Sequence, residues 1–232
     1  MKTTLTILSC LCIIICKSQS TTQNQDHYLS MFSSDTGKLV PPINLLDANG
    51  KKVSLNDFKG KILYLDFWIP GCTNCFSNFP LAKQLHERIK YLKLDTGIVF
   101  INIFSSGSTE EWKNLTNKYN PEGISLYSPD TSFYQSWGSK AFPHYSLVSR
   151  NNKFLASYYG LDPRTFEVDY ILYEAITKNM NGYNSYLMFK NQNEYHAKNM
   201  KYEQSEEGKD YGIWYNSIIM KIAKDRNLPL KK

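Results

Sequence analysis

Two nearly uninterrupted apolar stretches dominate the hydrophobic pattern of the chain, Lys61–Trp68 and Gly97–Phe104. Runs of this length without polar alternation are typical of strands that are buried on both faces of a parallel sheet. A shorter strand is predicted at Ile124–Tyr127. Paired short segments around turns predict two β-hairpins, Ile43–Leu46 with Lys52–Leu55 and Tyr145–Ser149 with Phe154–Ser157.

Helical spacing is clearest directly after the first long strand. An apolar stripe predicts a helix from just after Cys72 to about Leu92, and it consists of Phe79, Ala82, Leu85, Ile89 and Leu92. Pro80 lies inside this helix and is expected to kink it, because proline lacks a backbone donor and crowds the preceding turn.

Three further helices are predicted from their starts. Ser108 and Glu111 form a capping box that opens a helix to about Tyr119. A short helix is expected at Asp130–Trp137, and Asp162-Pro163 is typical of a helix start, in this case of a helix that ends near Asn181-Gly182.

The C-terminal residues 181–232 differ in composition and are expected to form a helical extension. They are rich in Asn, Tyr and Lys, and Tyr211–Arg226 is predicted to form an amphipathic helix. The favoured interpretation is a helix packed on the flank of the preceding domain, residues 38–180. A segment that docks a partner is the alternative.

The N-terminal residues 1–20 have the features of a signal peptide: Lys2, an apolar run and small residues at Ser18 to Ser20. Residues 21–37 are polar and are interpreted as a linker. Two lipoprotein-like alternatives, at Cys10 and Cys16, keep a membrane anchor at the N-terminus open. The chain is therefore predicted to be exported to a bacterial periplasm or cell envelope.

Charge and cysteine content narrow the function classes. The net charge of the 232 residues is +6, and removal of the first twenty residues, with Lys2 and Lys17, would leave about +4, spread along the chain. This gives no case for binding nucleic acid. Three of the five cysteines lie in the N-terminal segment, so cleavage leaves only Cys72 and Cys75. A disulfide framework and a four-cysteine zinc site are then excluded.

The remaining pair has the form Cys-x-x-Cys and follows an apolar strand through a turn at Pro70 and Gly71. A helix N-terminus favours negative charge, and hence thiolate over thiol. Cys72, nearer the helix end, is predicted to be the nucleophile that attacks a substrate disulfide. Cys75, one helical turn further in, is predicted to resolve the mixed disulfide.

The stretch Asp66-Phe-Trp68, three residues, then Cys72-Thr-Asn-Cys75, resembles the thioredoxin superfamily and most closely its TlpA/ResA-like envelope branch. Asp66 lies six positions before Cys72, and Pro80 lies five positions after Cys75, as in that superfamily. The resemblance covers Lys38 to Lys178. It implies an α/β thioredoxin-like fold, with a central mixed sheet flanked by helices and an N-terminal β-hairpin, and it implies no cofactor.

The resemblance also implies roles for single residues. Asp66, buried in an apolar strand, would accept the proton of Cys75. Trp68 would pack beneath the active-site turn and, with Phe142 and Pro143, belong to the substrate-binding residues. Pro143 would follow a cis peptide bond, and Phe142 would offer backbone groups to a substrate peptide. The sequence departs from the family in two places: the neighbouring strand has no lysine near Asp66, and Gly71 stands where many relatives have tryptophan.

The predicted function is an exported thiol-disulfide oxidoreductase. It would cycle a Cys72–Cys75 disulfide with protein thiol or disulfide substrates and an upstream electron donor, preferentially as a reductant. The alternative is a Cu(I)-handling module similar to Sco proteins, in which His144 would join the two cysteines. Peroxidase chemistry is disfavoured, because Ile69 stands where peroxiredoxins have a threonine. His27, His86 and His196 show no ligand spacing.

Overall fold

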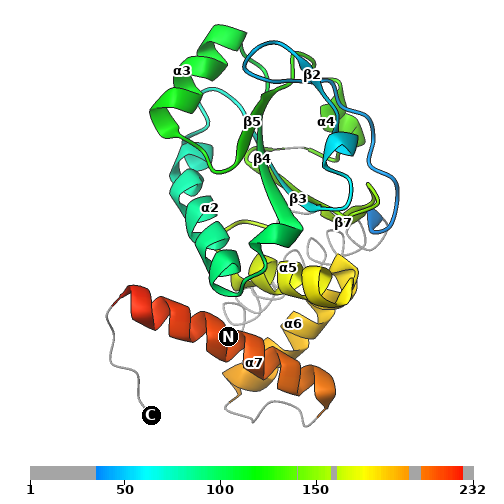
Figure 1. Cartoon of the computed structure of the whole chain (residues 1–232), viewed down its shortest axis with the longest axis vertical. Helices are drawn as coiled ribbons and strands as arrows, with labels where there is room; N and C mark the ends of the chain where they lie inside the picture. Colours follow the sequence, from blue (N-terminus) through cyan, green and yellow to red (C-terminus); the bar gives the residue numbers. More distant parts are fainter. Residues whose placement is uncertain (1–34, 140, 158–160, 199–204, 227–232) are drawn as a thin grey trace, which may run out of the picture.

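Seven strands form one mixed sheet across residues 35–139, 141–157, 161–198 and 205–226, which the computed structural model describes (Figure 1). Their order is β2-β1-β5-β4-β3-β6-β7. The parallel centre consists of β3 (Ile62–Trp68), β4 (Ile98–Phe104) and β5 (Ile124–Tyr127). The strands that run antiparallel to their neighbours are β1 (Leu45–Leu46), β2 (Lys52–Val53), β6 (His144–Val148) and β7 (Phe154–Ser157).

The helices flank this sheet, which confirms the predicted α/β architecture (Figure 1). Their bounds are α2 (Thr73–Tyr91), α3 (Thr109–Tyr119), α4 (Phe133–Ser136), α5 (Phe166–Lys178), α6 (Gly182–Ala197) and α7 (Glu206–Asp225), with short 3₁₀ helices η1 (Leu55–Phe58) and η2 (Asp95–Gly97). The starts of α2 and α3 match the sequence prediction. Pro80 lies inside α2, and the kink expected there stays a prediction.

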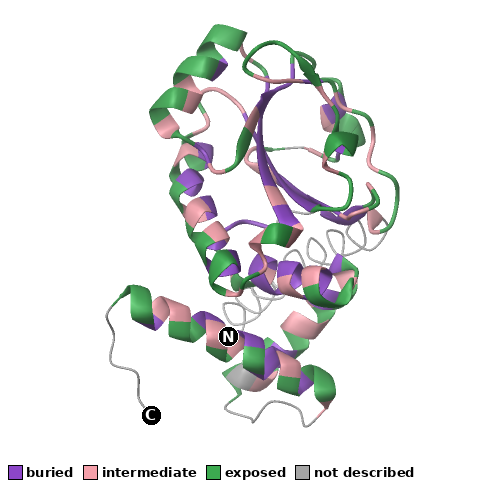
Figure 2. Ribbon diagram, viewed as in Figure 1, coloured by how far each residue is buried: buried purple, intermediate pink, exposed green. Residues whose placement is uncertain are grey.

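Strand β3 is the centre of the core because all of its side chains are buried (Figure 2). Side chains alternate between the faces of a strand. Ile62 and Tyr64 therefore pack with α2 and α5 on one face. Leu65 and Phe67 pack with Phe133 of α4 on the other face. Asp66 and Trp68 lie on the α2 face, since they share the alternation of Tyr64.

A buried ion pair ties α2 to α5. Arg88 donates to Asp169 through Nε to Oδ1 at 2.6 Å and through Nη2 to Oδ2 at 2.8 Å. The Asp169 side chain is 0% exposed and that of Arg88 is 11% exposed. A bidentate guanidinium–carboxylate pair fixes both distance and orientation. The two helices that cover the active-site face are thus held together by charge as well as by apolar packing.

The predicted start of α5 at Asp162-Pro163 was wrong by about one turn. Asp162 instead closes a turn before the helix, in which its backbone carbonyl accepts from the Thr165 backbone amide at 3.0 Å and its side chain accepts from the Arg164 amide at 2.9 Å. The helix begins at Phe166 with Thr165 as its N-cap residue. It also ends earlier than expected, at Lys178, because Asn179 adopts a left-handed conformation with φ of 56°.

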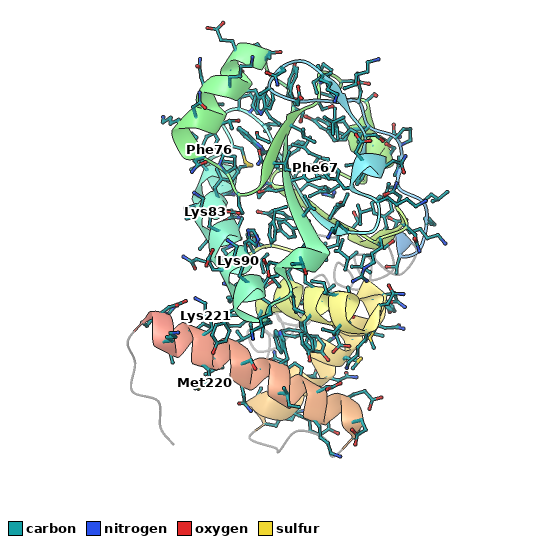
Figure 3. All side chains as sticks on the ribbon, viewed as in Figure 1. Phe67, Phe76, Lys83, Lys90, Met220 and Lys221 are labelled. Atoms are coloured by element: carbon teal, nitrogen blue, oxygen red, sulfur yellow. A yellow bond between two sulfur atoms is a disulfide. The ribbon has the colours of Figure 1, made fainter. Side chains whose placement is uncertain are left out.

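The C-terminal extension is helical, as predicted, and it packs against α5 through an aromatic cluster. Helix α7 contains the amphipathic helix that the sequence predicts, whereas α6 was missed. Tyr170 of α5, with Tyr211, Trp214 and Ile218 of α7, is fully buried. Helix α7 also contacts α2 near the end of α2 that carries Lys90 (Figure 3).

The described residues include no helix that is both long and apolar enough to cross a membrane. The predicted signal peptide at residues 1–20 and residues 21–34 of the predicted linker lie outside the described residues. The predicted boundary near residue 180 falls between α5 and α6.

Candidate active site

The two cysteines lie where β3 turns into α2. Gly71 has a φ of 73°, a left-handed conformation that favours glycine, and this turn brings Cys72 to the N-cap position of α2. The Cys72 sulfur accepts a hydrogen bond from the Cys75 backbone amide at 3.2 Å. The free amides and the dipole of the first turn favour negative charge at this sulfur.

Cys72 and Cys75 form a disulfide with an S–S distance of 2.08 Å and a Cα–Cα distance of 5.3 Å, so the structure is that of the oxidised protein. The two sulfurs differ in accessibility. Cys72 is half-buried, whereas Cys75 is 0% exposed behind it. An incoming disulfide or thiol can therefore approach Cys72 and cannot approach Cys75.

An open depression of about 310 Å³ surrounds Cys72. Its lining residues are Ile69, Pro70, Gly71, Cys72, Thr73, Asn74 and Phe142. Phe142 comes from the loop before β6, and its ring packs edge-on against that of Tyr134 with centroids 5.0 Å apart. The Phe142–Pro143 peptide bond is cis, as the family resemblance implies. The fold thus brings the residue before Pro143 to the edge of the depression around Cys72.

Trp68 lies beneath this depression and is 0% exposed. Its ring packs edge-on against Phe104 at 4.7 Å and Phe79 at 5.3 Å, and it shares an apolar cluster with Cys75. This agrees with the predicted position under the active-site turn. Full burial means that Trp68 supports the turn that carries Cys72, and its predicted grouping with the substrate-binding residues stays a prediction.

Asp66 lies on the same face of β3 as Trp68 and is 4% exposed. Its Oδ1 atom has no hydrogen-bond partner. Burial raises the pKa of the Asp66 carboxyl well above its ordinary value, and the negative charge of Asp162 raises it further. The register partner on β4 is Asn102, whose amide donates to the carbonyl oxygens of Glu122 and Ile124. Strand β4 thus places an amide beside Asp66 and contains no lysine.

His144 does not face the cysteines. It is the register partner of Phe67 across β3 and β6, and the centroids of the two rings lie 5.6 Å apart. Both rings lie on the sheet face opposite Asp66. Figure 3 labels Phe67 on this face and Phe76 on α2, which covers the other face. Burial lowers the pKa of His144 to about 4, so the ring is neutral near pH 7. No group of three or more potential ligands among His, Cys, Asp and Glu occurs within the described residues. Within the part of the chain that the structure describes, the ligand set of Cys72, Cys75 and His144 that the copper alternative needs is therefore not brought together.

Of the other histidines, His86 pairs with Glu122 at 2.6 Å and stacks on Phe100, away from the cysteines. His27 and the side chain of His196 lie outside the described part of the chain.

The sequence reasoning missed a polar cluster behind Cys75. Asn78, 3% exposed, donates to the Tyr145 hydroxyl at 2.9 Å and to Oδ2 of Asp162 at 3.1 Å. Arg164 forms an ion pair with Asp162 on the outer side of this cluster. A signal was present: Asn78 is a polar residue on the otherwise apolar stripe of the predicted helix, three positions after Cys75. Its partners, more than sixty positions away in sequence, left no such signal.

Comparison with known families gives one match over more than half of the chain. The family described as Redoxin matches residues 35–172. Among curated proteins, the thiol-disulfide oxidoreductase ResA of Bacillus thuringiensis is 24% identical over 148 residues, covering 64% of this chain and 83% of the relative. ResA of Bacillus subtilis is 34% identical over a shorter stretch of 74 residues, 32% of this chain and 40% of the relative.

Solved structures share the architecture. A protein from Bacteroides vulgatus assigned to the thiol-disulfide oxidoreductases superposes with a TM-score of 0.51 at 29% identity, covering 58% of this chain and 86% of its own. A crystal structure from the same organism reaches a TM-score of 0.53 at 23% identity, covering 61% and 96%. The second likeness supports the fold alone. The family match ends at residue 172, within α5 and before the two C-terminal helices.

Proposed function

Because this chain belongs to the Redoxin family, we propose that it is an exported thiol-disulfide oxidoreductase that reduces disulfides of protein substrates through Cys72 and Cys75. The membership in the TlpA/ResA-like branch supplies the reaction class. The observation that carries the proposal is the unequal accessibility of the two sulfurs. Cys72 borders an open depression at the start of α2, and Cys75 lies fully buried one turn behind it.

The first step uses Cys72. In the reduced protein, its thiolate attacks one sulfur of the substrate disulfide, the S–S bond of the substrate breaks, and the other substrate sulfur leaves as a thiolate. The N-terminus of α2 stabilises the attacking thiolate. Cys72 is then joined to the substrate through a mixed disulfide, and backbone groups of Phe142 at the edge of the depression hold the substrate chain beside it.

The second step uses Cys75 and Asp66. The Cys75 thiol gives its proton to the Asp66 carboxylate, directly or through one water, and the resulting thiolate attacks the Cys72 sulfur. The mixed disulfide breaks, the second substrate sulfur leaves, and the Cys72–Cys75 disulfide seen in the structure forms. Two electrons have passed from the dithiol to the substrate. An external dithiol donor reduces the protein for the next cycle.

The buried acids behind the cysteines support the reductant direction of the reaction. Of the described residues that line the depression, none is charged. Asp66 and Asp162 are buried acids, and negative charge near the cysteines opposes the stabilisation of thiolate by the N-terminus of α2. A less stable dithiolate makes the disulfide form relatively favourable, which is the property of a reductant. The predicted signal peptide assigns this activity to the periplasm or cell envelope.

The test measures reduction of insulin by the purified protein with a chemical dithiol as donor. We expect the wild type to accelerate precipitation of the insulin chains, Cys72→Ser to abolish the acceleration, and Cys75→Ser to accumulate a mixed disulfide on Cys72. His144→Ala is the matched control, because His144 faces the other side of the sheet, and it should retain most of the activity. Wild-type protein without reductase activity, or tight Cu(I) binding that His144→Ala removes, would overturn the proposal.

A further inference from the structure

A chain of buried polar groups runs from Asp66 away from the mouth of the active site. It starts with Tyr145, the register partner of Asp66 on β6, whose side chain lies on the same sheet face. Asn78 reaches Tyr145 from α2 and donates to its hydroxyl at 2.9 Å. Asn78 lies one helical turn after Cys75, so the chain passes directly behind the resolving cysteine.

The chain continues to a second buried acid, Asp162. Its Oδ2 atom accepts from Asn78 at 3.1 Å and from Nη2 of Arg164 at 2.7 Å, and its Oδ1 atom accepts from Nε of Arg164 at 2.9 Å. Asp162 is 9% exposed, whereas the Arg164 side chain is 61% exposed. The inner side of Asp162 therefore faces Asn78 and the sheet, and its outer side carries a cation that reaches solvent.

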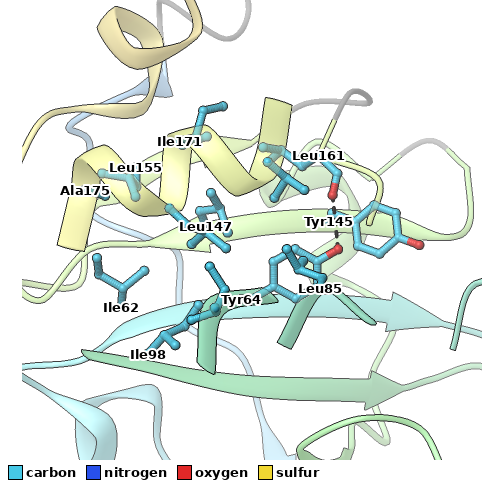
Figure 4. Close-up of a cluster of buried hydrophobic side chains, with 14 of the residues drawn as sticks. Ile62, Tyr64, Leu85, Ile98, Tyr145, Leu147, Leu155, Leu161, Ile171 and Ala175 are labelled. Atoms are coloured by element: carbon cyan, nitrogen blue, oxygen red, sulfur yellow. Dashed lines mark hydrogen bonds between the residues drawn. The ribbon is translucent and has the colours of Figure 1, made fainter. Parts of the chain in front are cut away.

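The segment that carries Asp162 is fixed to the sheet independently of Asn78. The Tyr64 hydroxyl donates to the carbonyl oxygen of Leu161 at 3.1 Å (Figure 4). Both groups are buried, so this bond holds the residue before Asp162 against β3. Asp162 is thus positioned by Tyr64 of β3, which binds the preceding residue, and by Asn78 of α2, which also binds Tyr145 of β6.

We propose that Asp162 is a positioning residue for the second step of the reaction: through Asn78 and Tyr145 it is held near Asp66, and its charge, offset by Arg164, controls when Asp66 takes up the proton of Cys75. This inference rests on the proposed function. The physical basis is repulsion between two carboxylates in a region of low dielectric, where each ionised acid disfavours ionisation of the other. Removal of Asp162 should make Asp66 more acidic, and removal of Arg164 should make it less acidic.

Among the described residues around Asp66, Asp162 and Arg164 carry the dominant charges, because the other groups are neutral or already paired. Tyr64 from β3 and Tyr145 from β6 face it as phenols, and burial raises the pKa of both hydroxyls, so they are neutral. Strand β4 contributes Asn102, and α2 contributes Cys75 and Asn78, and then Arg88. Arg88 is engaged by Asp169 of α5.

The experiment follows the second step alone. Reduced protein is mixed with 5,5′-dithiobis(2-nitrobenzoate), so that Cys72 displaces one coloured thiolate and keeps the other aryl thiol in a mixed disulfide. Release of the second coloured thiolate, by attack of Cys75 on Cys72, is recorded between pH 4 and 10. We expect the midpoint of the rate profile to fall by about half a pH unit or more in Asp162→Asn and to rise in Arg164→Gln. A charge effect shifts the midpoint in opposite directions in the two variants. A structural effect changes the rates but does not produce opposite shifts of the midpoint.

Glu87→Gln is the matched control, because it removes an exposed carboxylate from the outer surface of α2, and its midpoint should stay at the wild-type value. In an Asp66→Asn background the Asp162→Asn shift should fall to less than half. A shift that persists there means that Asp162 acts on Cys75 directly, and this overturns the inference. Unchanged midpoints in both Asp162→Asn and Arg164→Gln overturn it too.

The exposed Arg164 side chain keeps the test informative even if Asp162→Asn does not fold, since Arg164→Gln alone must raise the midpoint. The two proposals fail separately. Normal insulin reduction by the wild type with unmoved midpoints leaves the proposed function standing and removes only the role of Asp162. Absence of insulin reduction and of mixed-disulfide trapping removes the proposed function itself.

Discussion

Three buried acids on the α2 side of the sheet are compensated in three different ways. Asp169 has a bidentate partner in Arg88, and Asp162 has Asn78 and Arg164. Asp66 has neither a cation nor a partner for its Oδ1 atom. A buried carboxylate without compensation is costly when it is ionised. Asp66 is therefore the buried acid that costs the fold most when it is ionised, which agrees with the proposed role as proton acceptor for Cys75.

We expect Asp66→Asn to stabilise the oxidised protein above pH 6 and to leave its stability nearly unchanged at pH 3. Because the pKa of Asp66 is raised in the folded state, the carboxyl is protonated in both states at pH 3. As the pH rises, the unfolded chain ionises first, and the wild type loses stability up to the folded pKa. The gain amounts to about 1.4 kcal/mol for each unit by which the pKa is raised.

Urea unfolding at pH 3, 5, 7 and 9 measures this gain. Glu110→Gln, on the exposed surface of α3, is the control and should be within about 0.5 kcal/mol of the wild type at each pH. A gain that is as large at pH 3 as at pH 7 would mean that the amide packs better, and that the charge of Asp66 is not the cause.

The active-site residues differ in how far the sequence could predict them. Cys72, Cys75 and Asp66 could be located because each interrupts a regular pattern at a fixed spacing within one short stretch. The contact from Asn78 to Asp162 joins positions 84 apart in sequence, and no local pattern encodes it. Trp68 could be located but its exposure could not, since an aromatic residue at a strand end packs equally well beneath or beside a binding surface.

Among the elements, α2 connects the active site to the rest of the core. Its buried face carries Cys75, then Asn78 and Phe79 one turn later, and Arg88 near its end. Cys75 and Phe79 pack against β3, and Asn78 belongs to the polar cluster. Arg88 pairs with Asp169 of α5. The orientation of α2, and with it the depth of Cys75, therefore depends on the ion pair at the far end of the helix.

We expect Arg88→Met to lower the free energy of unfolding by about 3–5 kcal/mol, because it leaves the Asp169 carboxylate buried without its partner. The double variant Arg88→Met/Asp169→Leu should recover most of that loss, since apolar groups of similar volume can replace a buried pair. Denaturant unfolding near pH 7 measures both. A double variant that is as unstable as the single one would show that the geometry of the pair, and not removal of an unpaired charge, holds α2 on α5.

Regular hydrophobic patterns explain which elements could be predicted. The long strands are apolar except for one polar residue each, Asp66 and Asn102, and both were found close to their observed bounds. Helix α7 has a clear apolar stripe and was found, although it begins at Glu206, five residues before the predicted start. Helix α6 has no comparable stripe, because its contacts are divided between α5, α7 and β7. The start of α5 was misplaced because Asp162 has the sequence features of a helix cap, while its side chain is used by Asn78 and Arg164.

At the scale of the whole molecule, the two C-terminal helices extend the core of the family-matched part. Gly182, the first residue of α6, lies so close to β7 that an added Cβ would come within 2.2 Å of the Leu155 carbonyl oxygen. Tyr170 of α5 is 0% exposed because the aromatic residues of α7 cover it. Without α7, the ring of Tyr170 would be open to water, so the extension is expected to unfold together with the rest.

Substitution of Trp214 tests this coupling, and its neighbour Ile213 provides the control. Trp214 is 1% exposed and its ring packs 4.8 Å from that of Tyr170, whereas Ile213 is 62% exposed on the same helix. Trp214→Ala should cost about 3–5 kcal/mol of the free energy of unfolding, and Ile213→Ala should cost less than about 0.5 kcal/mol. If α6 and α7 fold with the sheet, the whole protein loses this stability in one transition, recorded identically by circular dichroism and by fluorescence.

The same variant separates stability from chemistry. Trp214 packs near Leu92, at the end of α2 opposite Cys72, and a helix of 19 residues is about 28 Å long. Trp214→Ala should therefore reduce insulin at the wild-type rate at temperatures where it is folded, and lose activity only as it unfolds. Two separate unfolding transitions, with the loss of stability confined to the first, would show instead that α6 and α7 form an independent unit that the redox fold does not need.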